Sequence, residues 1–324
     1  MLPPAWLPYR VRSVWNHRRV VHAVRRLHQT PAVAAVSPRD ARAEVHMLLC
    51  RRDVEIGILA LKSLLRFRET PWAVAITDSG TLTKRDRALI DRHVLGCRWL
   101  DRVASRSQTE SVFERRPRLA ALYRGPYEPL RKLIHPVALA GCPRVLVLDP
   151  DTLFSRRPER LAAWAADEAA PNLFLHDHQD EAANVPEATR DGFTELERIL
   201  TRTGGAWSMP SYFFNSGLLA YRRADCDLDI AERYLEWLET ADSRFKIGKP
   251  GLWFGDWTPE QTAYQLIFAR MNPPARPFGE DYRIGNRPGY TFNHFLWLQL
   301  VLPSSLVMLQ KVVRDLGESH PAAS

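Results

Sequence analysis

The chain has 324 residues, of which 45% are hydrophobic and 25% charged, which is typical of a globular protein and excludes a disordered or membrane-spanning chain. Its formal net charge of +8 is unevenly placed, because residues 1–43 carry eight arginines against one acidic residue, Asp40. The rest of the chain is nearly neutral, so the basic charge is a property of the N-terminal segment.

Within this segment, Arg and His alternate with Val and Leu at close to helical spacing over residues 10–28, which predicts a basic amphipathic helix. A linker rich in Pro and Ala follows over 31–38. Residues 1–43 are therefore expected to form a basic helical arm and linker. Such an arm could make peripheral contact with an anionic membrane, or could equally pack on the remainder of the chain.

Strands and helices alternate from residue 44 onward. Apolar runs typical of buried strands occur at 45–50, 72–77, 99–103, 145–148, 173–175 and 212–221. Apolar residues at helical spacing predict helices that include 56–67, 89–94 and 130–137. The alternation predicts an α/β domain over 44–295, with a mostly parallel central sheet flanked by helices. In such sheets ligands bind beyond the carboxyl ends of the strands.

Residues 296–324 are expected to form a C-terminal apolar helix and tail. The longest apolar stretch, 295–302, is too short to cross a bilayer. The N-terminus has no continuous apolar run typical of a signal peptide, and the four cysteines lack the spacing of a metal site. We expect reduced thiols and a cytoplasmic location.

The sharpest motif is the end of the apolar run 145–148, which leads directly into Asp149, Pro150 and Asp151. Residues two apart on an extended chain point to the same side, so both carboxylates could face one ligand. Hard oxygen ligands of this kind suit Mg²⁺ or Mn²⁺ shared with a substrate phosphate. A strand that merely ends in a polar turn would show the same three residues.

Several further motifs follow in order, and with them the chain resembles the GT-A fold nucleotide-sugar glycosyltransferases, particularly family 8, the group of glycogenin and bacterial lipopolysaccharide sugar transferases. The resemblance covers roughly residues 45–294. It includes Arg-Lys-Leu at 131–133, Phe-Asn-Ser-Gly-Leu-Leu at 214–219, Trp-Thr-Pro-Glu-Gln-Thr at 257–262 and Tyr-Thr-Phe-Asn-His-Phe at 290–295. The implied fold is GT-A, and the implied cofactor is Mn²⁺ or Mg²⁺ held on the diphosphate of a nucleoside-diphosphate sugar.

Residue by residue, the resemblance implies metal ligands at Asp149, Asp151 and His294, with Asp149 also reaching the donor. Lys132 is implied as a donor contact, and Asn215 and Gly217 are implied to line the donor-sugar pocket. Glu260 and Gln261 correspond to an acidic-Gln pair near the reaction centre, and Asp78, at the end of an earlier strand, is a further candidate for the nucleotide.

Each of these residues also has a structural interpretation. Thr258 followed by Gln261 fits a helix capping box, in which Gln261 would not reach the sugar. Lys132 could lie on a solvated helix face, Gly217 could mark a bulge, and a lone His294 on an apolar strand is usually a core residue. A cluster at 176–180, containing two His and two Asp, could line the acceptor side or form a solvated loop.

The sequence thus predicts an enzyme, a metal-dependent glycosyltransferase of the hexosyltransferase type. It would move a sugar from a nucleoside-diphosphate donor to a carbohydrate, glycolipid or protein hydroxyl, and family 8 implies retention of configuration. One alternative is a sugar-phosphate nucleotidyltransferase, although residues 50–53 lack the Gly-rich loop that cradles a triphosphate. Another is a non-catalytic protein that binds anionic membrane through its basic arm. No base-reading motif is present, so no nucleic-acid partner is expected.

Overall fold

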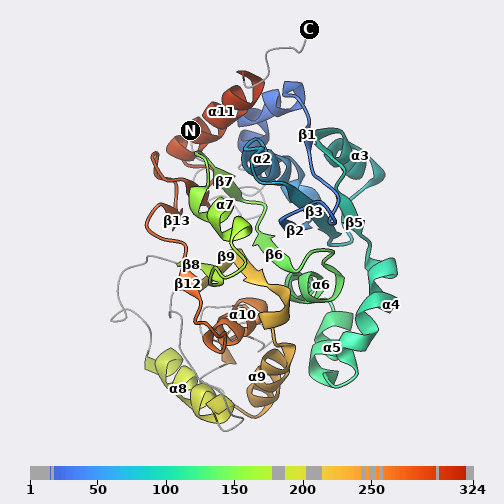
Figure 1. Ribbon diagram of the computed structural model, residues 1–324, viewed down its shortest axis with the longest axis vertical. Coiled ribbons are helices and arrows are strands. Elements are labelled where there is room, and N and C mark those ends of the chain that lie inside the picture. The colour runs from blue at the N-terminus through green and yellow to red at the C-terminus, as the bar shows by residue number, and fades with distance from the viewer. Residues whose placement is uncertain are drawn as a thin grey trace.

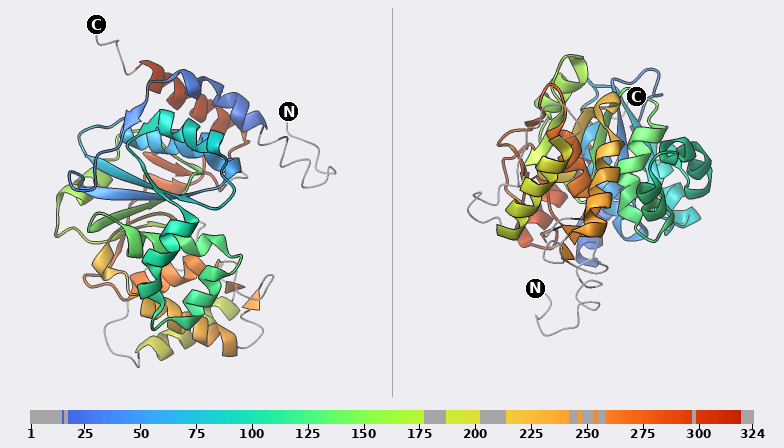
Figure 2. Two further views of the ribbon diagram at one scale, coloured as in Figure 1. Left: turned by 90° about the vertical axis from the view of Figure 1, so that its right-hand side faces the viewer. Right: turned by 90° about the horizontal axis from the view of Figure 1, so that it is seen from below.

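A computed structural model describes residues 15, 18–176, 187–201, 214–241, 246–247, 253–254, 258–296 and 299–318. A central sheet lies between two layers of helices (Figures 1 and 2). The seven strands of this sheet run in the order β12-β8-β9-β6-β2-β3-β5. They are β2 (Ala43–Leu49), β3 (Trp72–Asp78), β5 (Arg98–Leu100), β6 (Arg144–Leu148), β8 (Leu173–His176), β9 (Phe214–Arg222) and β12 (Arg276–Pro277).

The sheet is mostly parallel, as predicted. The pairs β2–β3, β2–β6, β3–β5 and β8–β12 are parallel, whereas β9 runs antiparallel to both β6 and β8. The three central strands are buried along almost their whole length, because helices cover both faces. The carboxyl ends of β2, β3 and β6 therefore meet at one edge, and the reversed β9 brings its first residues to the same edge.

Each face of the sheet has its own apolar core. The first core includes residues of α2 (Val54–Leu65), α3 (Lys84–His93), α7 (Glu159–Ala166) and α11 (Pro303–Glu318). The second core includes residues of α4 (Arg102–Phe113), α5 (Pro117–Arg124), α6 (Arg131–Leu139), α8 (Glu187–Thr201), α9 (Leu228–Thr240) and α10 (Pro259–Ala269). The stretch 105–125, for which no element was predicted, forms α4 and α5, and the strand expected at 99–103 ends at Leu100 because α4 begins at Arg102.

A second, three-stranded sheet lies beside the end of β6. Its order is β13-β14-β7, from β13 (Tyr282–Ile284), β14 (Phe292–His294) and β7 (Thr152–Phe154). Two smaller sheets pair β1 (Val33–Ala34) with β4 (Val94–Leu95), and β10 (Lys246–Ile247) with β11 (Trp253–Phe254). Short 3-10 helices are η1 (Arg25–Gln29), η2 (Arg51–Asp53), η3 (Glu128–Leu130) and η5 (Arg223–Asp225).

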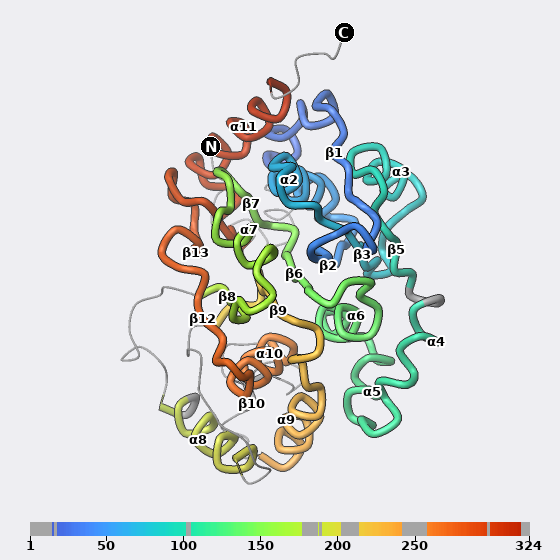
Figure 3. The backbone as a smooth tube through the Cα atoms, viewed as in Figure 1, coloured from blue at the N-terminus to red at the C-terminus, as the bar shows by residue number. Residues whose placement is uncertain are grey.

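The described part of the N-terminal segment packs on the sheet domain. Residues 18–23 are helical and continue into η1, and Val20, Val24 and Leu27 are buried in the first core. This helix lies beside α11, although the two are almost 300 residues apart in the chain (Figure 3). Among the described residues, no helix has the length and apolar character needed to span a membrane.

A buried lysine fastens the end of this segment. Lys62 on α2 is fully buried, and its Nζ donates to Thr30 Oγ1 and Pro31 O, each at 2.6 Å. Its other neighbours are Thr30 O at 3.3 Å and His93 Nδ1 at 3.4 Å. Burial lowers the pKa of Lys62 to about 8, and burial together with the Lys62 cation lowers the pKa of His93 to about 4.

Candidate metal centre

Three potential metal ligands meet where β6 and β14 end. Asp149, Asp151 and His294 each offer one ligand atom, and these atoms lie within 4.8 Å of one another. His294 Nε2 is 3.2 Å from Asp151 Oδ1 and 3.8 Å from Asp149 Oδ2. Asp151 and His294 are buried, while Asp149 is partly exposed. The two carboxylates do face one point, as their spacing predicted, and His294 joins them from 143 residues further along the chain.

Backbone pairing holds the three residues together. In the antiparallel pair β7–β14, His294 lies opposite Thr152, the residue that follows Asp151. The Phe295 N–H donates to Asp151 O at 3.0 Å, and the Thr152 hydroxyl donates to Asp149 O at 2.8 Å. Pro150 lies outside both strands, where its missing N–H breaks no ladder.

This donor set suits Mn²⁺ or Mg²⁺. Two carboxylates and one imidazole are ligands of the type that Mn²⁺ accepts, and an accessible Asp149 leaves one side of the centre open to a substrate. Burial alone would lower the pKa of His294, but the Asp151 and Asp149 carboxylates outweigh it and raise this pKa above its ordinary value. A metal cation would replace that proton at Nε2.

Asn215 and Gly217, at the start of β9, contact the histidine. Asn215 Oδ1 accepts the Gly217 N–H at 2.7 Å, which identifies this atom as the amide oxygen. The same oxygen is 3.1 Å from His294 Nδ1, so Nδ1 must carry a proton, and Nε2, which faces the aspartates, is the nitrogen that would bind a metal. A Cβ on Gly217 would overlap the imidazole of His294, so only glycine fits at this position.

Lys132, on the side of α6 that faces β9, is an ion-pair partner of the centre. Its Nζ lies 2.5 Å from Asp149 Oδ1 and 3.1 Å from Ser216 Oγ, and its side chain is largely buried. Gln261 Oε1 lies 3.3 Å from Ser216 N and 3.4 Å from Ser216 Oγ. Gln261 therefore points toward the centre, and the alternative of a capping box is wrong because Thr258 makes no side-chain cap bond.

Glu260 is held by its own partners. The Tyr127 hydroxyl donates to Glu260 Oε2, and the Thr258 hydroxyl donates to Oε1 at 2.8 Å. Burial, together with the Glu260 carboxylate, raises the pKa of Tyr127 far above its usual range, so the phenol stays protonated as a donor. Both carboxylate oxygens of Glu260 are thus engaged within the chain.

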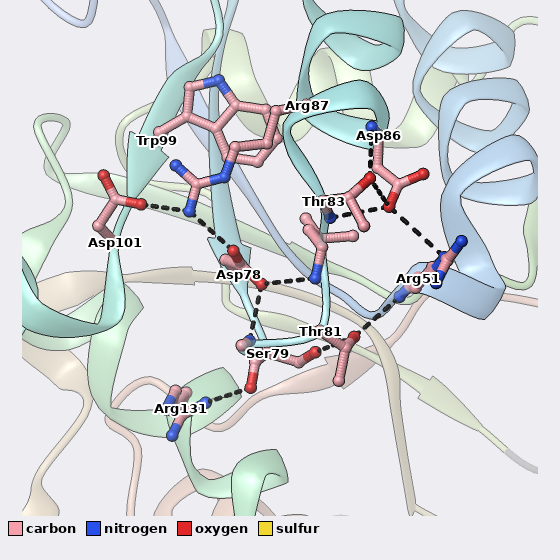
Figure 4. A network of polar contacts seen from close by, with 12 residues as sticks. Arg51, Asp78, Ser79, Thr81, Thr83, Asp86, Arg87, Trp99, Asp101 and Arg131 are labelled. Atoms are coloured by element: carbon pink, nitrogen blue, oxygen red, sulfur yellow. Dashed lines mark hydrogen bonds and ion pairs between the residues drawn. The ribbon is translucent and has the colours of Figure 1, made fainter.

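Asp78 organises the loop after β3 (Figure 4). Its Oδ1 accepts the N–H of Gly80 at 2.7 Å, and its Oδ2 accepts from Arg87 at 2.7 Å. Buried Arg131, next to Lys132, donates to Ser79 O at 3.1 Å. Through these contacts Asp78 fixes the loop after β3 at the carboxyl edge of the sheet.

Asp53 lies in η2, shortly after β2, and the Asp151 carboxylate contributes to its electrostatic environment. Burial raises the pKa of Asp53, although the Cys50 thiol at 2.8 Å and Arg52 at 3.3 Å lower it in part. The cluster at 176–180 contributes only half-buried His176 to the structure, and its other members lie outside the described residues.

Sequence reasoning missed two contributors to this site. Ser216 was part of a quoted motif but had no role of its own, yet it connects Lys132 to Gln261. Tyr127 precedes α6 in a polar stretch, and nothing in the sequence connects it with Glu260, 133 residues away.

No protein-family model matches this sequence, and no curated protein sequence matches it. Among solved structures, an active-site mutant of LgtC aligns over 84% of this chain and 95% of its own, with 13% identity and a TM-score of 0.53. Mouse xyloside xylosyltransferase 1, in its apo form, aligns over 78% and 96%, with 14% identity and a TM-score of 0.47. Core-mannan synthase A from Aspergillus fumigatus, in its Mn/GDP form, aligns over 77% and 76%, with 13% identity and a TM-score of 0.46.

The LgtC structure carries the comparison, because it combines high coverage of both chains with the highest TM-score of the three. At 13% identity the similarity concerns the arrangement of the backbone. The chain therefore has the GT-A fold, which confirms the fold class expected from its sequence.

Proposed function

We propose that this protein is a metal-dependent glycosyltransferase that moves a sugar from a nucleoside-diphosphate sugar to an acceptor hydroxyl. The observation that carries the proposal is the meeting of Asp149, Asp151 and His294 at the carboxyl edge of a GT-A sheet. The LgtC fold supports it, since LgtC is described as a galactosyltransferase in complex with donor and acceptor sugar analogues.

Asp149, Asp151 and His294 would hold Mn²⁺ or Mg²⁺. Such an ion supplies Lewis acidity and neutralises the charge that grows on a departing diphosphate. We expect Mn²⁺, because an imidazole ligand is better suited to Mn²⁺ than to Mg²⁺. A cytoplasmic location fits four thiols that form no disulfide.

The chain's own residues would complete the site. Lys132 now neutralises Asp149, and an arriving diphosphate would offer its Nζ a second anionic partner at the same edge. Asn215 would orient His294 through Oδ1 and offer its remaining amide N–H groups to the donor sugar. Gln261, anchored to Ser216, would line the same pocket, with Gly217 providing room for the histidine.

Glu260 and Asp78 would support donor binding without being held in place by the donor itself. Glu260 is oriented by Tyr127 and Thr258, and Asp78 holds the loop at which the nucleotide would lie. A carboxylate held in place in this way can stabilise positive charge that develops on the reacting sugar. Retention of configuration, as in family 8, belongs to the same proposal.

The test is a panel of nucleoside-diphosphate sugars with Mn²⁺, in which the released nucleoside diphosphate is measured. We expect turnover of at least one donor and its loss on chelation. Asp151→Asn should lose more than the roughly 10–100-fold that removal of an outer-shell partner of a metal costs. Asp40→Asn, an exposed aspartate outside the site, is the matched control and should keep full activity.

Two outcomes would reject the proposal. The first is a panel without turnover while the protein binds Mn²⁺ and is folded. The second is turnover of a sugar 1-phosphate with a nucleoside triphosphate and release of pyrophosphate, which would indicate a nucleotidyltransferase instead.

A further inference from the structure

The two amphipathic helices at one end of the molecule form a single basic face. The N-terminal helix, residues 18–29, contacts α11, and the two lie side by side above the sheet (Figure 2). Their apolar sides face the same core, which contains Val20, Val24 and Leu27 from one helix and Leu309 and Val312 from the other. The polar sides of both helices therefore point outward together.

These outward sides carry cations almost exclusively. Arg18, Arg25, Arg26, Lys311 and Arg314 are exposed. Of the acidic residues on the described part of the two helices, Glu318 is exposed, and the partly exposed Asp315 pairs with Arg66 at 3.8 Å. Within the described chain, none of the five cations lies within 4.0 Å of a carboxylate oxygen. A groove of about 590 Å³ runs between the helices and is lined by Arg25, Arg26 and Arg314, with Glu318 as its acidic residue. The surplus of cations gives this face a positive potential that would attract an extended anionic partner.

The basic face continues toward the candidate metal centre. His28, at the end of the N-terminal helix, lines a second groove of about 990 Å³. That groove also contains Arg51, Arg52, Arg85 and Arg92, against Glu55 and Asp86. Arg52 contacts Asp53 in η2, so the cations extend from the helix pair to the segment after β2, at the edge of the sheet that carries the centre.

The face is preformed. The Lys62 ammonium bonds to Thr30 and Pro31, directly after the N-terminal helix, and β1 pairs with β4 just beyond them. Since the apolar side of this helix is already buried in the core, it is not available for insertion into a bilayer. The segment therefore does not act as a free amphipathic helix, and its contact with a membrane would be mainly electrostatic.

We infer that this basic face docks the protein electrostatically on an anionic membrane surface, with the helix pair at the level of the lipid phosphates. Val307 on α11 is 64% exposed, and Trp15, which precedes the N-terminal helix in the chain, is 47% exposed. Such residues suit the boundary between headgroups and hydrocarbon, whereas a nucleic-acid backbone would use only the cations. Docking in this orientation brings the second groove, and the centre beyond it, close to the membrane.

The test is sedimentation of the full-length protein with phosphatidylcholine vesicles, with and without phosphatidylserine. Arg25→Gln/Arg26→Gln/Arg314→Gln removes three cations of the face. Arg115→Gln/Arg198→Gln/Arg276→Gln removes three exposed cations elsewhere and is the matched control. Each juxtamembrane cation contributes about 1 kcal/mol, so the first variant should bind anionic vesicles on the order of 100-fold more weakly, and the control should bind as the wild type does.

Binding should also fall steeply between about 0.1 M and 0.5 M salt and be absent for neutral vesicles, because it depends on unscreened charge. Equal binding by the two triple variants, salt-independent binding, or equal binding to neutral vesicles would overturn the inference. So would tighter binding of an RNA duplex than of anionic vesicles at the same salt. None of these measurements needs donor turnover, so docking and glycosyl transfer can fail separately.

Discussion

Three contacts orient the imidazole of His294. Gly217 leaves the space that the ring occupies, Asn215 accepts the proton of Nδ1, and Asp151 faces Nε2. Two of these residues come from β9, and the third follows β6, so the ring is held between neighbouring strands of the main sheet. Metal ligands are commonly oriented through the ring nitrogen that does not bind the metal, and the Asn215–His294 pair has that arrangement.

We expect Gly217→Ala to displace the imidazole. The added Cβ would overlap His294, and forced overpacking of this kind costs about 1–3 kcal/mol of stability. Mn²⁺ affinity, measured by titration calorimetry, should fall with it. Gly317→Ala is the matched control, because a Cβ on Gly317 meets no atom within 4 Å and should be neutral or slightly stabilising. Unchanged Mn²⁺ affinity in Gly217→Ala would contradict the placement of His294.

Asn215 offers a more specific test of tautomer control. Asn215→Ala removes the acceptor at Nδ1 and should weaken Mn²⁺ binding by roughly 10–100-fold, as loss of other outer-shell partners does. Asn215→Asp keeps an acceptor oxygen and should restore most of the affinity. At a pH high enough for Nε2 to be deprotonated, nitrogen-15 spectra of the metal-free protein should show the proton on Nδ1 in the wild type and a mixture of tautomers in Asn215→Ala. Equal affinity for all three proteins would rule out this role.

At the scale of elements, the sequence predicted the central strands well because their apolar runs have one interpretation. The expected 45–50, 72–77 and 145–148 correspond closely to β2, β3 and β6. The helices within 105–125 were harder to predict, because arginines dominate the composition of this stretch. Its few apolar residues, such as Leu119 and Tyr123, become recognisable as helix faces only when α9 and α6 are in place to cover them.

The same limit applies to the site. The sequence identified Asp149 and Asp151 as a pair, because they are separated by one residue and follow the same strand. The capping-box alternative for Gln261 could not be rejected from sequence, since Thr258 and Gln261 have the right spacing. The three-dimensional structure rejects the capping box, because β9 lies close to α10 and brings the Ser216 N–H and hydroxyl to the Gln261 side chain.

Lys62 gives a pH-dependent prediction for the contact between α2 and the N-terminal segment. Its folded pKa of about 8 lies below the ordinary 10.5, so the unfolded chain binds more protons between these values and stability rises with pH across that window. The free energy of unfolding of the wild type, relative to Lys62→Met, should increase by up to about 3 kcal/mol between pH 8 and 10.5.

Urea denaturation at both ends of the window measures this difference, and subtracting the variant removes the contribution of the thiols that titrate in the same range. Lys311→Met serves as the control, because the exposed Lys311 loses little hydration on folding. The free energies of unfolding of the wild type and Lys62→Met could instead differ by the same amount at every pH. That result would mean that the Lys62 ammonium is better solvated than its burial indicates.

At the scale of the whole molecule, the candidate metal centre connects distant parts of the chain. Asp149 and Asp151 follow the central sheet, whereas His294 comes from the second sheet, near the last helix. Metal that binds the folded state and not the unfolded chain stabilises the protein by about 2.7 kcal/mol at a concentration of 100 times Kd. Mn²⁺ should therefore raise the Tm of the whole domain, and Asp151→Asn should abolish the increase.

The size of that increase should depend on pH. The neighbouring aspartates raise the pKa of His294, so the metal-free protein keeps a proton where the metal would bind up to a higher pH than an ordinary histidine would. Binding then releases this proton, and each fall in pH makes the exchange less favourable. We expect the Mn²⁺-induced increase in Tm, measured by differential scanning calorimetry, to shrink between about pH 8 and pH 6. A His294→Gln variant, whose amide oxygen does not titrate in this range, should show a smaller increase that varies less with pH. The same pH dependence in wild type and variant would assign the proton to a group other than His294.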